Sequence, residues 1–132
     1  MSNKKSGNQF EAELCEILSK HGFWVHNLAQ NSAGQPADVI AVKNGSAYLI
    51  DCKVCSNGRF ALGRIEENQS LAMELWRDCG NGNGWFALKF GDKIHMVSHY
   101  LLQLLGKKNS SITEKMLQVT DLTLEKWLEV RS

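Results

Sequence analysis

Apolar residues near the start of the chain recur at the spacing of a helix. Phe10, Leu14, Ile17 and Leu18 stand at i, i+4, i+7 and i+8, which places them on one side of an α-helix. Gly22 follows, and glycine is the usual residue just beyond a helix C-terminus. We therefore predict a helix over residues 8–21 with one buried face.

Short stretches rich in β-branched and aromatic residues follow this helix and return after position 84. Asn44-Gly45 separates two of them, and this dipeptide is typical of a type I′ hairpin, so the two strands should be antiparallel neighbours. Residues 29–35 contain Ser32-Ala-Gly34 and indicate a loop. The expected strands cover residues 23–28, 37–43, 46–54, 85–90 and 93–97.

Three later segments carry helical periodicity. The first is ended by the glycine- and asparagine-rich residues 80–84, and residues 107–111 indicate a polar loop. These helices are expected over residues 64–78, 100–105 and 123–130. The pattern predicts an α/β fold, a mixed five-stranded sheet flanked by helices, in a single domain over residues 1–132.

Composition narrows the class of protein. Of 132 residues, 43% are hydrophobic, 22% are charged and one is a proline, as in compact folded domains. No apolar run approaches the roughly 20 residues of a membrane-spanning helix, so no membrane partner is expected. Residues 1–7 lack the apolar stretch of a secretory signal, and we expect a cytoplasmic protein. The formal net charge of +1 is too small by itself to indicate a nucleic-acid partner.

Cysteine and histidine spacing gives little support for a soft-metal or redox site. Cys52 and Cys55 match C-x-x-C, but residues three apart in a strand point to opposite faces, and no second pair follows at zinc spacing. His95 and His99 straddle an expected strand end and helix start. We interpret both pairs as ordinary structural residues, in a chain whose four thiols fit a reducing compartment.

Two acidic residues interrupt the predicted strands. Asp51 and Lys53 share one strand face, because side chains alternate along a strand, and Asp38 on the partner strand can face Asp51, depending on the register. Neighbouring carboxylates repel each other, and a hard divalent cation such as Mg²⁺ or Mn²⁺ removes that repulsion. The alternative is that both acids form ordinary ion pairs, with Lys43 and Lys53.

A polar residue interrupts the predicted helix over residues 64–78. Gln69 shares its face with Ile65, Ala72 and Trp76, and an amide buried there without partners would cost about 1 to 3 kcal/mol. We therefore expect a hydrogen bond from Gln69. Its partner is either the acidic site or bound DNA, or else a strand carbonyl.

The order of these residues resembles the PD-(D/E)XK nuclease superfamily, in which an acid is followed by an acid-x-Lys motif such as Asp51-Cys-Lys53. Residues 5–14 are similar to the first helix of the archaeal Holliday junction resolvases. Residues 59–69 are similar to the loop and helix of the RecU-like resolvases and their phage relatives, and residues 85–90 to the strand that follows in both. The matches cover about residues 5–97. Two departures are that Ala37 separates Pro36 from Asp38, and that the second acid is Asp rather than the commoner Glu.

The resemblance implies metal-dependent hydrolysis of a DNA phosphodiester. It implies that Asp38, Asp51 and the backbone carbonyl of Cys52 bind Mg²⁺, for which Mn²⁺ can substitute, and that Glu11 binds it directly or through water. It places Lys53 beside the attacking water. Helical periodicity does not choose between Glu11 and Glu13, and only the resemblance selects Glu11.

The resemblance also assigns Gln69 to the catalytic set and gives candidate DNA contacts, namely Lys5, Ser32, Arg59 and Arg64, although solvated surface arginines are the alternative for the last two. We predict a structure-selective endodeoxyribonuclease of DNA recombination and repair, a Holliday junction resolvase that acts on four-way junctions as a homodimer. The alternatives are a nuclease of flap, duplex or restriction-type specificity, and a catalytically silent DNA-binding module.

Overall fold

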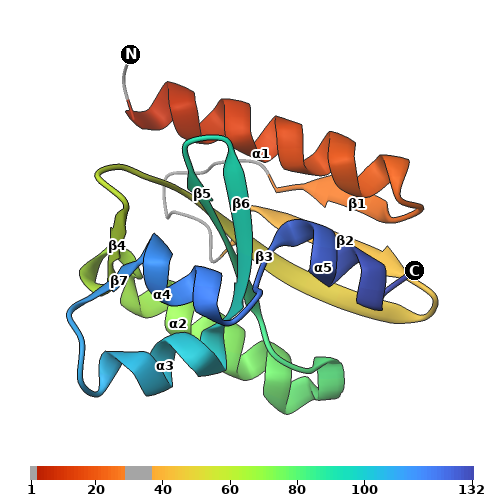
Figure 1. Cartoon of the computed structure of the whole chain (residues 1–132). Coiled ribbons are helices and arrows are strands. Elements are labelled where there is room, and N and C mark those ends of the chain that lie inside the picture. Colours follow the sequence, from red (N-terminus) through yellow and green to blue (C-terminus); the bar gives the residue numbers. More distant parts are fainter. Residues whose placement is uncertain (1–2, 29–36) are drawn as a thin grey trace.

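A five-stranded sheet forms the centre of the protein and helices cover both of its faces (Figure 1). The computed structural model describes residues 3–28 and 37–132, with side chains from residue 7 onward. The loop predicted over residues 29–35 lies outside the described residues. The helices are α1 (Asn3–Lys20), α2 (Glu67–Trp76), α3 (His99–Gly106), α4 (Glu114–Val119) and α5 (Leu124–Val130). The strands are β1 (Trp24–Asn27), β2 (Val39–Lys43), β3 (Ser46–Cys55), β4 (Arg59–Ala61), β5 (Trp85–Phe90), β6 (Lys93–Ser98) and β7 (Ser111–Thr113).

The hairpin between β2 and β3 forms as the sequence predicts. Lys43 pairs with Ser46 and Val39 with Ile50, in antiparallel register. Asn44 has φ 52° and Gly45 has φ 80°, and a type I′ turn requires positive φ at both central positions. Because this turn fixes the register, it also fixes which side chains of β2 and β3 face each other.

The main sheet has the order β1-β2-β3-β5-β6, and β5 runs parallel to β3 while the other pairs are antiparallel. A parallel pair needs a long crossover, which here contains β4, the 3₁₀ turn η1 (Leu62–Arg64) and α2. The predicted α/β class with a mixed five-stranded sheet is confirmed. The crossover matters for function because it carries α2 over one face of β3.

Two hydrophobic cores occupy the two faces of the sheet. On one face α1 and α5 pack on Ile50 and Cys52, and on the other α2, α3 and α4 pack on Leu49 and Cys55. Strand alternation therefore places Asp51 and Lys53 on the α2 face. The residues that line the first core from the helices are Phe10, Leu14, Leu18, Leu124, Trp127 and Leu128.

Several boundaries differ from the prediction. The first helix begins at Asn3 rather than residue 8. The second begins at Glu67 rather than residue 64, because Glu66 and Gln69 form a capping box there, and it ends at Trp76 before a π turn, η2 (Arg77–Asn81). The ribbon of β4 and β7 and the helix α4 were not predicted. In the described ranges, no helix is long and apolar enough to cross a membrane.

Candidate active site

The hairpin register brings two buried carboxylates together. The backbone N–H of Asp38 donates to the carbonyl of Ile50 at 3.1 Å, so Asp38 stands one position beyond the last β2–β3 pair, beside Asp51. Oδ2 of Asp38 accepts a 2.8 Å hydrogen bond from the backbone N–H of Cys52. Asp38 is 8% exposed and Asp51 1% exposed. The sequence left it to the strand register whether Asp38 faces Asp51, and the observed register places the two side by side.

Lys53 and Gln69 meet Asp51 from the same face of the sheet. Nζ of Lys53 lies 3.2 Å from Oδ2 of Asp51, and Nε2 of Gln69 donates to Oδ1 at 3.2 Å. Oε1 of Gln69 in turn accepts from Nζ of Lys53 at 3.3 Å and from the backbone N–H of Glu66 at 3.1 Å. Gln69 therefore bonds the acid and the lysine of the motif rather than a strand carbonyl.

The site is short of positive charge. Burial raises the pKa of Asp51 well above its usual range, Asp38 raises it further, and the opposing effect of Lys53 is smaller. Nζ of Lys53 forms an ion pair with Oδ2 of Asp51 at 3.2 Å, and among the described residues this buried oxygen has no further partner. Two carboxylates and one ammonium in such a place favour a further cation.

The structure separates Glu11 from Glu13. Glu11 is 9% exposed, and burial followed by the charge of Asp38 raises its pKa to about 7. Glu13 is exposed and pairs with Lys89 of β5 at 2.7 Å. Glu11 thus lies where the charge of Asp38 acts on it, whereas Glu13 bonds a lysine of β5; the choice of Glu11 as a metal ligand remains a prediction.

Cys52 can offer its backbone carbonyl but not a thiolate. Its side chain lies in the core under α1, and burial together with the nearby acids raises the pKa of its thiol well above the usual range. Cys55 lies in the opposite core, so the C-x-x-C pair is split by the sheet as predicted. In the part of the chain that the structure describes, no three His, Cys, Asp or Glu side chains are grouped as a metal site.

The oxygen set nevertheless fits a hard divalent cation. It consists of two carboxylates and one main-chain carbonyl, and Oδ2 of Asp51 has no partner among the described residues besides its ion pair with Lys53. The alternative pairing of Asp38 with Lys43 is not favoured. Lys43 lies at the far end of β2, where its Nζ donates to the carbonyl of His21 at 2.6 Å and stands over the Phe23 ring.

The predicted DNA contacts differ in their surroundings. Arg59 is exposed on β4. Nη1 of Arg64 donates to the carbonyl of Val54 at 2.8 Å and its guanidinium stands over Phe60, so this arginine also fastens the end of β3 to the crossover. Lys5 lies in α1, but its side chain is outside the described residues, as is the whole of Ser32.

Sequence reasoning missed one group that supports the site. Ser70 follows Gln69, and its Oγ lies 3.1 Å from Nε2 of the buried His99, which ties α2 to α3. Burial lowers the pKa of His99, so the ring stays neutral in this contact. No local sequence signal pairs these residues, because they are far apart in the chain.

The fold and this acid, acid and lysine arrangement define the class of protein as a PD-(D/E)XK nuclease. Residues 2–131 match the family model of the archaeal Holliday junction resolvases (Hjc), and the chain belongs to that family. It is therefore a structure-selective endonuclease of the junction-resolving class, as the sequence predicts.

Two known proteins are similar to the chain. The crossover junction endodeoxyribonuclease Hjc of Methanocaldococcus jannaschii is 26% identical over 112 residues, which cover 85% of this chain and 79% of the relative. The solved structure of the Holliday junction resolvase Hjc of Archaeoglobus fulgidus superposes with a TM-score of 0.70 at 19% identity. It covers 94% of this chain and 96% of that one, which supports the fold assignment.

Proposed function

We propose that the protein cleaves four-way DNA junctions with Mg²⁺ held by Asp38, Asp51 and the carbonyl of Cys52, and with Glu11 binding the ion directly or through water. The observation that carries this proposal is the buried acid pair, in which the pKa of Asp51 is raised although Lys53 lies 3.2 Å away. Oxygen ligands of this kind suit Mg²⁺, and Mn²⁺ can replace it. When bound, the ion would lower the pKa of a water molecule and neutralise charge on the phosphate.

Lys53 would contribute the second positive charge at the scissile phosphate. Its ammonium is largely buried, which strengthens its interaction with negative charge that develops during attack on phosphorus. We assign to it the orientation of the attacking water or the stabilisation of that charge. Gln69 is a positioning residue, because it contacts Asp51 and Lys53 together and acts through them.

Arg59, Arg64, Lys5 and Ser32 remain our candidates for contacts to the DNA backbone. Between Lys53 and Arg64 the chain has no acidic residue, so the first part of the crossover, before α2, carries only positive charges. Contacts to phosphates position a duplex without reading its sequence. This arrangement supports recognition of DNA shape rather than of a base sequence.

We further propose that two copies of the chain form the working enzyme. Resolution of a junction needs two strands of like polarity to be cut about a two-fold axis, and one such site cannot cut both at once. Leu71 and Leu75 stand one turn apart on α2 and are 56% and 64% exposed. This apolar stripe, on the helix that carries Gln69, is our candidate dimer surface.

The decisive experiment compares a mobile four-way junction with duplex, flap and single-stranded DNA, in Mg²⁺, in Mn²⁺ and with chelator. We expect paired nicks in the junction with either ion and none with chelator. Equal cleavage of duplex or flap would assign the protein to a nuclease of other specificity. Tight junction binding without cleavage in any metal would instead support a catalytically silent binding module.

A further inference from the structure

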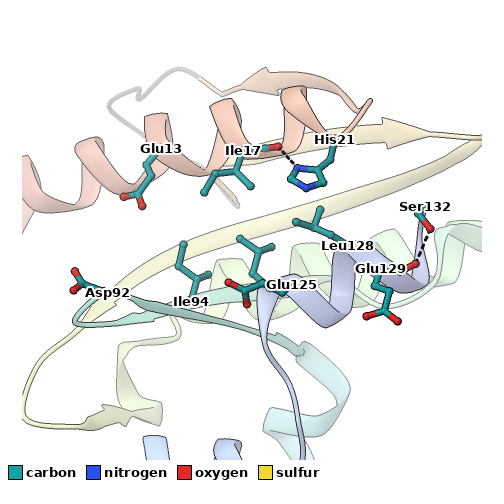
Figure 2. A pocket seen from close by; sticks show the side chains of 10 residues that line it. Glu13, Ile17, His21, Asp92, Ile94, Glu125, Leu128, Glu129 and Ser132 are labelled. Atoms are coloured by element: carbon teal, nitrogen blue, oxygen red, sulfur yellow. Dashed lines mark hydrogen bonds between the residues drawn. The ribbon is translucent and has the colours of Figure 1, made fainter.

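A groove lies on the face of the sheet that does not carry Asp51. It has a volume of about 450 Å³ and is formed between α1 and α5, beside the turn that joins β5 to β6 (Figure 2). Ile94, Leu124 and Leu128 belong to the core under α1 and α5, whereas Asp51 faces α2. The proposed cleavage site therefore leaves this groove unused.

The groove combines an aliphatic floor with an acidic rim. Figure 2 shows Glu13 and Ile17 projecting from α1 toward Ile94 and Leu128 on the opposite wall. The lining has four aliphatic residues and four acids, but no lysine or arginine. The aliphatic residues are Ile17, Ile94, Leu124 and Leu128, and the acids are Glu13, Asp92, Glu125 and Glu129.

Two of the four acidic side chains on the rim have no ion-pair partner among the described residues. Glu13 pairs with Lys89 at 2.7 Å, and Glu129 lies 3.8 Å from Lys126. Among the described residues, Asp92 and Glu125 form no ion pair. A rim of this sign repels DNA phosphates and attracts a cationic partner, and the floor suits an apolar side chain.

We propose that this groove docks a basic amphipathic segment of a partner protein. One apolar side chain of the segment would enter between Ile17 and Leu128, and lysines or arginines on either side of it would meet Asp92 and Glu125. An amphipathic helix laid into an apolar groove is a common mode of peptide recognition. The acid pair lies on the opposite face of the sheet, and Glu11 of α1 is not among the residues that line the groove, so the partner would leave the cleavage site open.

A second copy of this chain does not fit the groove as well. Its exposed apolar stripe on α2, Leu71 and Leu75, is flanked by Glu67 and Glu74 within the same helix. Those acids would meet the acidic rim, and like charges across an interface disfavour the complex. The charge pattern thus favours a different, basic protein.

The test uses a fluorescein-labelled peptide of about 16 residues, with leucines on one helical face and lysines on the other, a length at which helices form in isolation. Fluorescence anisotropy at near-physiological salt measures its affinity for the whole protein. The groove variant is Asp92→Lys with Glu125→Lys, and Ile17→Ser removes part of the floor. The matched control is Glu16→Lys with Asp78→Lys, which changes the net charge equally at exposed sites outside the groove.

We expect the groove variant to weaken peptide binding about tenfold or more and Ile17→Ser to weaken it several-fold, while the control changes it by less than about twofold. Junction cleavage by all three should stay at the wild-type rate, which also shows that they fold.

Equal losses of peptide affinity in the groove and control variants would show that the peptide binds by general charge attraction, and would overturn the proposal. The proposal would also be overturned if spermidine displaced the peptide with an affinity equal to that of the peptide itself, because the groove would then be a site for small polyamines. Loss of self-association in the groove variant, measured by sedimentation, would assign the groove to a second copy.

Discussion

Nε2 of Gln69 donates a 3.2 Å hydrogen bond to Oδ1 of Asp51 across the space between α2 and β3. The other end of the same amide accepts from Lys53, so a single side chain on the crossover helix contacts both the acid and the lysine. Gln69 is also the N3 residue of the α2 capping box. The start of the helix and the geometry of the site are therefore coupled.

Replacement of Gln69 by Leu should lower junction cleavage by an order of magnitude or more. A polar contact that orients groups around developing charge is worth about 2 to 4 kcal/mol. Melting should fall as well, since the change removes the capping bond to Glu66 and leaves the buried Oδ1 of Asp51 without its Gln69 donor, a loss of about 1 to 3 kcal/mol. Gln103→Leu is the matched control, because Gln103 bonds Glu74 at the surface at 3.1 Å. Full activity with a strongly lowered melting temperature would show that Gln69 has only a structural role.

Asp51→Asn should abolish cleavage and stabilise the metal-free protein. The folded pKa of Asp51 lies above its unfolded value, so the ionised carboxylate costs stability at neutral pH, and this cost vanishes as the pH falls below the unfolded value. We expect the melting temperature in chelator at pH 7.5 to rise by several degrees, whereas the exposed Asp78→Asn leaves it unchanged. A lower melting temperature for Asp51→Asn would contradict the charge-burial argument.

Lysines at the exposed α2 stripe should prevent formation of the proposed dimer. The variant Leu71→Lys with Leu75→Lys adds two charges to an apolar surface, and sedimentation at micromolar concentration should then show monomer with reduced paired nicking. Val119→Lys is the control, since Val119 is 83% exposed on α4. A wild-type protein that is monomeric both with and without junction DNA would remove the dimer proposal.

Most of the sheet could be predicted from local sequence patterns. The Asn44-Gly45 turn predicted the β2–β3 pairing, and strand alternation placed Asp51 and Lys53 on one face, because both signals depend only on neighbouring residues. The same alternation predicted that Cys52 and Cys55 lie in opposite cores. These features needed no knowledge of distant contacts.

Features that depend on tertiary contacts were not predictable. The β4–β7 ribbon joins residues near Phe60 to residues near Ile112, both of them buried, and each strand is too short to give a periodic signal. Glu11 and Glu13 flank the same apolar stripe. Only the packing of α1 on the sheet shows that one approaches Asp38 while the other pairs with Lys89.

His99 should make stability depend on pH. Burial lowers the pKa of His99 in the folded state below its unfolded value of about 6.5. The unfolded chain therefore takes up the proton first, and stability is lost as the pH falls from the unfolded pKa through the folded one. His99→Gln keeps a polar group near Ser70 but does not titrate. The free energy of unfolding of the wild type relative to this variant should therefore decrease between pH 7.5 and pH 5. A difference that stays constant over this range would contradict the buried neutral ring.

Arg131 should hold the C-terminal helix in place through aromatic rings. Its guanidinium lies 4.1 Å from the ring centroid of Trp127, 5.0 Å from that of Trp85 and 5.2 Å from that of Tyr48, and its Nη1 donates to the carbonyl of Trp127 at 3.0 Å. Partly desolvated cation–π contacts contribute about 1 to 2 kcal/mol, and a flat guanidinium stacks better than an ammonium.

Arg131→Ala should therefore lower the free energy of unfolding by about 2 kcal/mol, with Arg131→Lys recovering part of the loss. The tryptophan fluorescence of the folded protein should change as well, because Trp85 and Trp127 lose a charge against their rings. Lys126→Ala, on an exposed part of α5, is the control for removal of one positive charge. Cleavage per folded molecule should not change in any of the three, since α5 packs on the face of the sheet opposite Asp51. Equal stability of Arg131→Ala and the wild type would show that helix packing alone retains α5.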